Sequence, residues 1–257
     1  MKTISFLYWF LALASSALVA TGQVAFNGTY TQDFDTLASS GNTVAWTDNS
    51  TLPGWYGYRA DGSFPMVFPT YCASGESYGG IHSFGDDSDR AFGSFANTST
   101  DIIYFGLRLT NSTGSEISSL DIDYTAEQWR VGSTGSVNNR WNFQYSLNAT
   151  SVQDASATWV AVSSLGFDSI IDTAADEGIL DGNDVAKNLS VSGSVALSWQ
   201  NGNDVWLRWI DVDDVSWDAG MGIDNLTVSS VPEPAGFAAL MGLGILTGAA
   251  TRRRRRD

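Results

Sequence analysis

The chain has very few of the side chains on which nucleophilic enzymes and zinc proteins depend. Its 257 residues include one cysteine, Cys72, and one histidine, His82. A lone cysteine excludes an internal disulfide bond and a zinc site built on cysteines. Cys72 and His82 lie in one glycine-rich region, which permits a Cys-His pair without indicating one, and Ile81–Phe84 has the pattern of a strand. The sequence therefore predicts a protein that is not an enzyme.

Basic residues are also scarce. Between residues 23 and 230 the chain carries 26 Asp and Glu against 7 Lys and Arg, which gives this region a net charge of about −19. A surface this acidic repels phosphate backbones and anionic lipid headgroups. We therefore expect no nucleic-acid partner.

Glutamate is rare among these acids. The glutamates of residues 23–230 are Glu76, Glu116, Glu127 and Glu177. A glycan-active hydrolase needs two carboxyl groups about 5–10 Å apart, but the pattern Glu-x-Asp-x-x-Glu of jelly-roll glycanases is absent. Glu127 is flanked by Trp129 and Arg130, where a hydrogen bond or salt bridge that orders a strand competes with a role as general acid. A secreted hydrolase with paired carboxylates remains the alternative function.

Helical periodicity is nearly missing, with Ile170–Asp176 as the one candidate segment. Alternation is common instead: Ile103, Phe105, Leu107 and Leu109 fall on one face of a strand, and two alternating runs flank the turn at Asn201-Gly202. The absence of a fixed repeat argues against a propeller or solenoid. The pattern predicts an all-β, antiparallel two-sheet sandwich of jelly-roll type, with a barrel as the alternative.

Long apolar runs occur only near the two ends. Lys2 precedes the apolar stretch Ile4–Leu13, which is typical of a signal peptide over residues 1–22. At the other end an uncharged stretch precedes five arginines, a layout that stops a segment in a membrane with the arginines on the cytoplasmic side. We expect residues 23–230 to form one extracytoplasmic domain and residues 231–257 to form a separate signal with a short transmembrane helix.

This C-terminal layout resembles the PEP-CTERM sorting signal of Gram-negative bacteria. Its parts are the motif Pro232, Glu233 and Pro234, the apolar helix Phe237–Ala250, and the basic stop Arg252, Arg253, Arg254, Arg255 and Arg256. The resemblance implies processing by an exosortase-type membrane protease, transient insertion in the inner membrane, and delivery to the cell envelope or extracellular matrix. An ordinary tail anchor is the alternative.

The domain itself is similar to uncharacterised exported bacterial proteins that carry such tails. The segments that carry this similarity include Leu52-Pro-Gly-Trp55, Glu127-Gln-Trp-Arg130 and Gly222-Ile-Asp-Asn-Leu-Thr-Val228. The similarity implies no activity.

The acidic residues suggest a structural calcium ion, because calcium binds carboxylate and carbonyl oxygens. By strand parity Asp224 shares a face with Leu226 and Val228, which we expect to point inward. A buried carboxylate is costly without hydrogen bonds or a cation, so Asp224 with Asp33 or Asp35 is the candidate metal site. Backbone N–H donors to Asp224 are the alternative. The acidic stretches 168–184 and 211–218 fit solvated loops as well as metal sites.

Tryptophan is abundant, with ten in the chain. Trp141, Trp199 and Trp209 follow strand alternation and are expected in the core. Trp55, Tyr56 and Tyr58 lie in a loop-rich stretch, residues 38–77, and are the candidates for exposed rings that stack on sugars.

Together these features predict an exported surface or matrix protein. Its expected role is structural or adhesive, with calcium-supported polysaccharide binding. A shallow aromatic platform would favour this binding role, and a deep cleft with paired carboxylates would favour the hydrolase.

Overall fold

The computed structural model describes residues 23–231, except 42, 62–65, 69–78, 86–87, 133–138, 174–177 and 216. The signal peptide at residues 1–22, Cys72, the sorting motif Pro232, Glu233 and Pro234, and the run Arg252–Arg256 lie outside the described residues. Within the described part, we find no helix with the length and apolarity needed to cross a bilayer.

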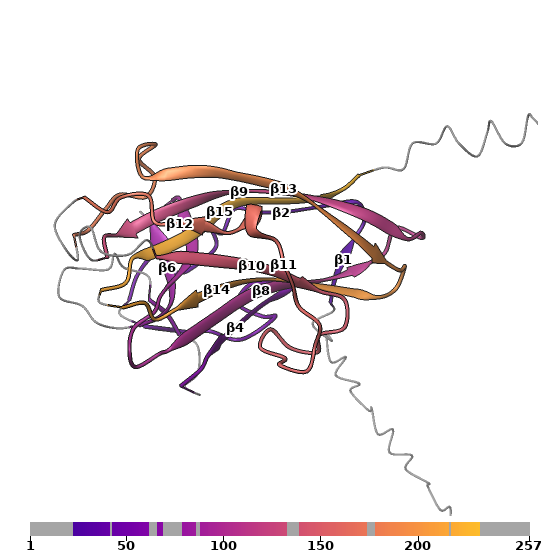
Figure 1. Ribbon diagram of the computed structural model, residues 1–257, viewed down its shortest axis with the longest axis horizontal. Coiled ribbons are helices and arrows are strands. Elements are labelled where there is room, and N and C mark those ends of the chain that lie inside the picture. Colours follow the sequence, from indigo (N-terminus) through magenta and orange to yellow (C-terminus); the bar gives the residue numbers. More distant parts are fainter. Residues whose placement is uncertain are drawn as a thin grey trace, which may run out of the picture.

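The chain folds into two β-sheets that pack face to face, shown as a lower and an upper layer in Figure 1. Sheet A, the lower layer, contains β1 (Val24–Phe26), β4 (Trp55–Arg59), β8 (Ile102–Asn111), β10 (Arg140–Ser146), β11 (Val160–Ala161), β12 (Phe167–Asp168) and β14 (Asp204–Val212). Its order is β1-β8-β14-β10-β11, with β4 also beside β8 and β12 also beside β10.

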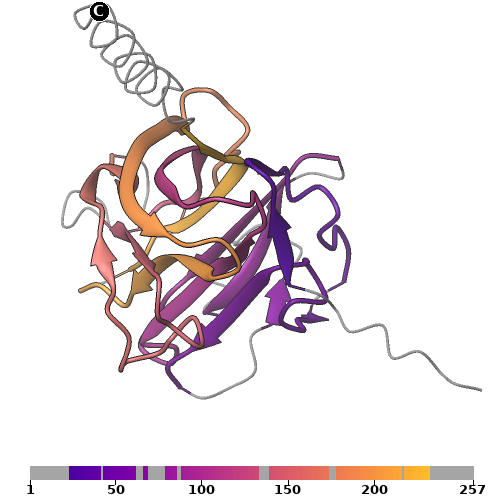
Figure 2. The ribbon, with the colours of Figure 1, turned by 90° about the vertical axis from the view of Figure 1, so that its right-hand side faces the viewer.

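Sheet B contains β2 (Thr29–Gln32), β3 (Val44–Ala45), β5 (Met66–Phe68), β6 (Gly80–Gly85), β7 (Arg90–Phe95), β9 (Ile117–Arg130), β13 (Asn188–Trp199) and β15 (Gly220–Ser230). Its order is β13-β9-β15-β7-β6-β5-β3, and β2 pairs with β15. Figure 2 shows the long strand β13, in orange, curving over one side of the sandwich. The all-β two-sheet sandwich is confirmed, and the pairs are antiparallel except β1–β8 and β5–β6.

Among the described residues the single helix is the 3₁₀ turn η1 (Ser163–Leu165). The expected helical segment is Ile170–Asp176. Residues 170–173 are not helical, and residues 174–176 are not among the described residues. The expected segment spans only seven residues, fewer than the roughly 12–15 that an isolated helix needs in water.

The core lies between the sheets and follows the predicted alternation. Ile103, Phe105, Leu107 and Leu109 point inward from β8 and are fully buried. Trp209 of β14 packs across the core against Tyr124 of β9, with their ring centres 5.6 Å apart. Each such side chain contributes about 1.5–3 kcal/mol of burial free energy, so inward parity fixes the register of the central strands.

The prediction that residues 38–77 are loop-rich is wrong for β4, and the predicted exposure of Trp55 is wrong. Trp55 pairs with Leu107 across β4 and β8 and therefore points inward, where it is fully buried. Its indole N–H donates to the hydroxyl oxygen of Tyr30 at 2.9 Å. Tyr56 and Tyr58 have the opposite parity and lie half-buried on the outer side of sheet A.

The predicted inward parity of Asp224 is also wrong. The pairing of β15 with β9 shifts register between Asp224 and Thr227, and Asn225 has a φ of 53°. These features mark a β-bulge, which moves the following residues to the opposite face. Leu226 and Val228 are in the core, whereas Asp224 lies on the outer side of sheet B, although it remains only 2% exposed.

Candidate functional site

The outer face of sheet A is the surface on which aromatic and polar side chains gather, and its layout follows from strand register. Three rows of paired residues cross β4, β8, β14 and β10. They are Tyr58, Tyr104, Ile210 and Asn142; Tyr56, Gly106, Arg208 and Gln144; and Arg108, Trp206 and Ser146, in which β4 has no member. We call this set, together with Trp159, the outer face.

Rings line one side of this outer face. The rings of Tyr58 and Tyr104 lie 6.0 Å apart, and those of Tyr56 and Trp206 lie 4.7 Å apart. Trp206 is 1% exposed and forms the floor, with the guanidinium of Arg108 above it at 5.6 Å. The three tyrosines are half-buried, so each keeps part of its surface exposed.

The segment after β10 folds back over the other side of the outer face. Arg208 donates from Nη1 to the carbonyl oxygen of Val152 at 2.8 Å, and its guanidinium lies 3.5 Å from the ring centre of Trp159 and 4.7 Å from that of Tyr104. Burial lowers the pKa of Arg208 to about 10, yet the side chain stays charged at neutral pH. Arg208 therefore connects the sheet to the wall that carries Trp159.

Asp154 organises this wall. Its carboxylate accepts hydrogen bonds from the backbone N–H and hydroxyl of both Thr150 and Ser156, and these bonds hold the pKa of Asp154 well below its usual range. The indole N–H of Trp159 donates to the carbonyl oxygen of Asp154 at 2.7 Å. Trp159 is thus fixed before any ligand arrives.

The outer face combines flat apolar rings with fixed polar groups. Aromatic rings offer broad apolar faces, while guanidinium and amide groups offer directed hydrogen bonds. Arg108 also holds Asp204 in an ion pair, and Gln144 accepts from Nε of Arg208 at 3.0 Å. The arrangement can bind a molecule with both C–H faces and hydroxyl groups.

The predicted metal residues Asp33, Asp35 and Asp224 come near one another because β2 pairs with β15. This register places Gln32 opposite Leu226, and Asp33 and Asn225 line one shallow cavity of about 340 Å³. Burial raises the pKa of Asp224 to about 7, and the charges of Asp35 and Asp33 add to the shift. The Oδ1 atom of Asp224 is buried without a hydrogen-bond partner.

Glu127 lies on the same outer side of sheet B and is 3% exposed. Burial raises its pKa to about 8, and Asp224 is the next cause. Its Oε2 accepts from the indole N–H of Trp129 at 3.0 Å, as expected for a residue that orders its strand. Over the described residues, however, no three His, Cys, Asp or Glu side chains converge closely enough to hold a metal ion.

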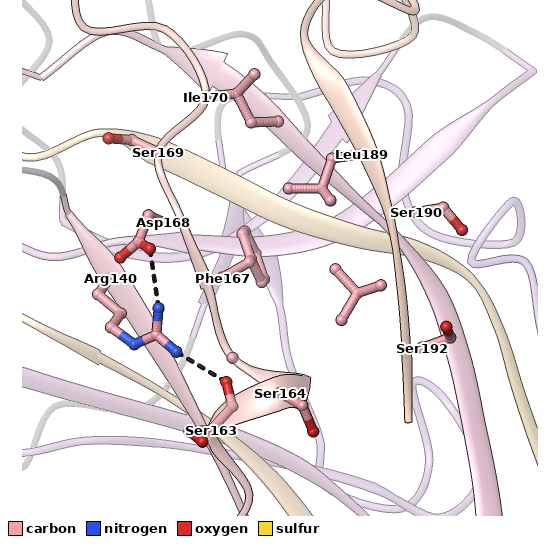
Figure 3. Close-up of a pocket in the computed structure, with 12 residues that line it drawn as sticks. Arg140, Ser163, Ser164, Phe167, Asp168, Ser169, Ile170, Leu189, Ser190 and Ser192 are labelled. Atoms are coloured by element: carbon pink, nitrogen blue, oxygen red, sulfur yellow. Dashed lines mark hydrogen bonds and ion pairs between the residues drawn. The ribbon is translucent and has the colours of Figure 1, made fainter. Parts of the chain in front are cut away.

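A second cavity, of about 560 Å³, lies between β13 and residues 163–170, which include η1 and β12 (Figure 3). Arg140 enters it from β10 and pairs with Asp168 at 2.9 Å, while Leu189 and Phe167 line its apolar side. Five serine hydroxyls complete the lining, and Asp168 is its one carboxylate. The cavity therefore lacks the carboxylate pair of a glycosidase.

Paired carboxyls do occur beside Trp217, in a cavity of about 240 Å³. Burial raises the pKa of Asp218 to about 8, and a hydrogen bond with Asp213 adds to the shift. Carboxyls in direct hydrogen-bond contact are closer than the separation of about 5–10 Å that glycosidases use. Asn139 donates to Asp218 at 3.1 Å and to Asp214 at 2.9 Å, so this cluster holds its own loop together.

Sequence reasoning missed most of the outer face. It selected Tyr56 and Tyr58 but not Tyr104, Trp206 or Arg208, although inward Phe105 and Leu207 already imply that their neighbours point outward. The position of Trp159 depends on the return of a loop from a distant segment, and no local pattern signals it.

No protein-family model and no curated protein matches the chain. Among solved structures, the K2 adhesin domain of Lys-gingipain aligns with a TM-score of 0.40 and 13% identity over 79% of this chain and 98% of that one. A xylan-binding domain of Paenibacillus barcinonensis Xyn10C gives 0.36 and 10% over 82% and 99%. A mannan-binding carbohydrate-binding module gives 0.36 and 11% over 75% and 97%. Structural neighbours thus include carbohydrate-binding modules.

Proposed function

We propose that the protein binds polysaccharide through the outer face of sheet A and acts as a non-enzymatic adhesive or structural protein. One observation carries this proposal: three half-buried tyrosines and the fixed ring of Trp159 border polar groups on a single sheet face. Sugar rings present C–H faces to aromatic rings and hydroxyl groups to polar side chains. Rigid rings lose little conformational entropy when a ligand binds.

Depletion from solution by a panel of insoluble polysaccharides tests this proposal. We expect at least one polysaccharide to retain the domain, and Tyr104→Ala to weaken retention about tenfold or more, as for a central ring contact. Trp217→Ala is the matched control, because Trp217 is 48% exposed and lies outside the outer face. The proposal would be refuted if both variants lost retention equally. It would also be refuted if no polysaccharide retained the wild-type domain.

We further propose that a calcium ion stabilises the sandwich near Asp224. The buried Oδ1 of Asp224 lacks a hydrogen-bond donor, and the charges of Asp33 and Asp35 act on it. A cation there would offset their repulsion and satisfy the orphaned oxygen. Small movements of the β2–β3 connection would have to bring Asp33 and Asp35 within ligand distance, since the described side chains do not converge on one point.

Thermal melts with and without calcium test this second proposal. Calcium should raise the melting temperature of the wild type, because a ligand that binds only the folded state stabilises it. Asp224→Asn should abolish that rise, while Asp123→Asn on the exposed part of sheet B should preserve it. An unchanged wild-type melting temperature at millimolar calcium would exclude the ion.

The export route rests on the terminal segments and is likewise proposed. We infer that residues 1–22 are removed on export and that Pro232, Glu233 and Pro234 direct an exosortase-type protease to the chain while it is inserted in the inner membrane. Mass spectrometry of the protein from cells checks this route. A mature C-terminus upstream of Arg252 would support it, and an intact arginine run on the mature protein would oppose it.

A further inference from the structure

The outer face carries a cation that no carboxylate neutralises among the described residues. Of the two arginines on this face, Arg108 pairs with Asp204. Arg208 forms no ion pair among the described residues, and the residue is 7% exposed. A buried guanidinium without a counter-charge is costly, so this part of the outer face favours an incoming anion.

The guanidinium of Arg208 also retains hydrogen-bond capacity. An arginine has five N–H donors. Those of Arg208 make three hydrogen bonds, two to Oε1 of Gln144 and one to the carbonyl oxygen of Val152. One N–H group remains on Nη1 and one on Nη2, the two nitrogens through which a guanidinium can bind a carboxylate with parallel hydrogen bonds. The rings of Trp159 and Tyr104 fix the plane of this guanidinium.

The charge of the whole domain limits what kind of anion can approach. With 26 acidic and 7 basic residues between 23 and 230, the domain repels a polymer that carries a negative charge on every unit. Screening reduces this repulsion to short range, about 8 Å in physiological salt. A single carboxylate on an otherwise neutral chain avoids most of the repulsion and still reaches Arg208.

We propose that the outer face selects a glycan with a mostly uncharged backbone and isolated acidic sugars, and that Arg208 receives the sugar carboxylate. This inference rests on the glycan binding proposed above. It adds a charge requirement that the aromatic rings alone do not impose.

Matched ligands test the charge requirement on the wild-type protein. Glucuronoxylan and xanthan carry acidic side groups on two different neutral backbones, and each can be compared with the same polymer after its carboxyl groups are reduced to alcohols. We expect reduction to weaken binding about tenfold or more for the polymer that binds, because charge-assisted hydrogen bonds are lost. Polygalacturonate, charged on every unit, should bind more weakly than the native polymer.

Variants of Arg208 test the assignment of the residue. Arg208→Gln should bind the native and reduced polymers equally, and Arg208→Lys should recover only part of the preference because lysine lacks the planar guanidinium. Lys187→Gln is the control, since Lys187 pairs with Asp184 just before β13 of sheet B, outside the outer face. If Arg208→Gln fails to fold, binding of the native and reduced polymers by the wild type and by Arg208→Lys still tests the charge requirement and the role of Arg208.

The outcomes separate the two proposals. Equal binding of native and reduced polymer by the wild type overturns the charge requirement and leaves glycan binding in place. Retention of the wild type by uncharged polysaccharides alone also overturns the charge requirement and leaves glycan binding in place. A preference that persists in Arg208→Gln overturns the role of Arg208. Binding to no polysaccharide overturns both proposals.

Discussion

Single residues determine how rigid the outer face is, and this rigidity bears on the proposed binding of polysaccharide. Trp159 is held from two sides, by its indole hydrogen bond to Asp154 and by the guanidinium of Arg208. Val152, which receives a hydrogen bond from Arg208, is 2% exposed and anchors the same segment. A ring fixed in this way costs less entropy on binding than one on a free loop, so the residues that hold Trp159 matter as much as the ring.

Asp154→Ala should loosen the wall without unfolding the sandwich. The change removes four hydrogen bonds from Thr150 and Ser156, all of them at the surface of the domain. We expect faster amide hydrogen exchange at Thr150 and Ser156 and a weaker affinity for the retained polysaccharide. Exchange in β8 and β14 should stay unchanged.

The comparison with Ser156→Ala completes this experiment, because that variant removes one of the four bonds. An intermediate effect would support the role of Asp154. Unchanged exchange at Thr150 in Asp154→Ala would contradict it.

At the scale of elements, strand alternation predicts most of the sandwich and only part of the site. The inward runs of β8 and β14 were readable because their apolar residues repeat with period two. The same alternation predicts that Tyr104, Arg108 and Trp206 point outward. A single sequence does not show, however, which strands become neighbours. Register across β4, β8, β14 and β10 assembles the outer face, and register is set by long-range pairing.

Strand alternation also predicts the wrong face for residues on either side of a β-bulge. The bulge at Asn225 reverses the expected face of Asp224, and bulges have weak sequence signals. Trp55 shows a different problem: the sequence places it in a loop-rich stretch, because Pro53-Gly54 directly before it conceals a short edge strand.

Asn225→Val should destabilise the domain by about 1–3 kcal/mol. A β-branched residue is strained at the left-handed φ of 53°. Asn225→Gly also loses the hydrogen bond from Asn225 to Asp224, but glycine adopts this conformation without strain. The difference in stability between the two variants therefore measures the backbone strain. Urea unfolding checks both variants, with Thr227→Val on the same strand as control. A valine variant as stable as the glycine variant would show that the bulge is not strained.

At the scale of the whole molecule, the acidic composition extends into the interior. Asp211 and Asp218 are each 3% exposed, and Asp211 accepts a hydrogen bond from the hydroxyl of Ser94 at 2.6 Å. Burial raises the pKa of Asp211 to about 7 and that of Asp218 to about 8. The folded state therefore holds protons that the unfolded state has already released above pH about 4.

This difference predicts that stability falls as pH rises. Because the folded state binds more protons than the unfolded state, the free energy of unfolding decreases from pH about 4 to about 8 and then levels off. Asp211→Asn should flatten the profile by removing one titrating group while keeping a polar partner for Ser94. Urea midpoints measured from pH 4 to 9 in calcium-free buffer check this, with exposed Asp123→Asn as the control. A wild-type profile that rises toward pH 8 would contradict it.

The most direct test of glycan binding by the outer face is a calorimetric titration of the retained polysaccharide into three proteins. These are the wild type, the double variant Tyr104→Ala and Trp159→Ala, and the control Trp217→Ala, each checked for an unchanged β-sheet circular dichroism spectrum. We predict saturable binding by the wild type and the control and no measurable binding by the double variant. Wild-type affinity in the double variant would show that the outer face of sheet A is not the binding site.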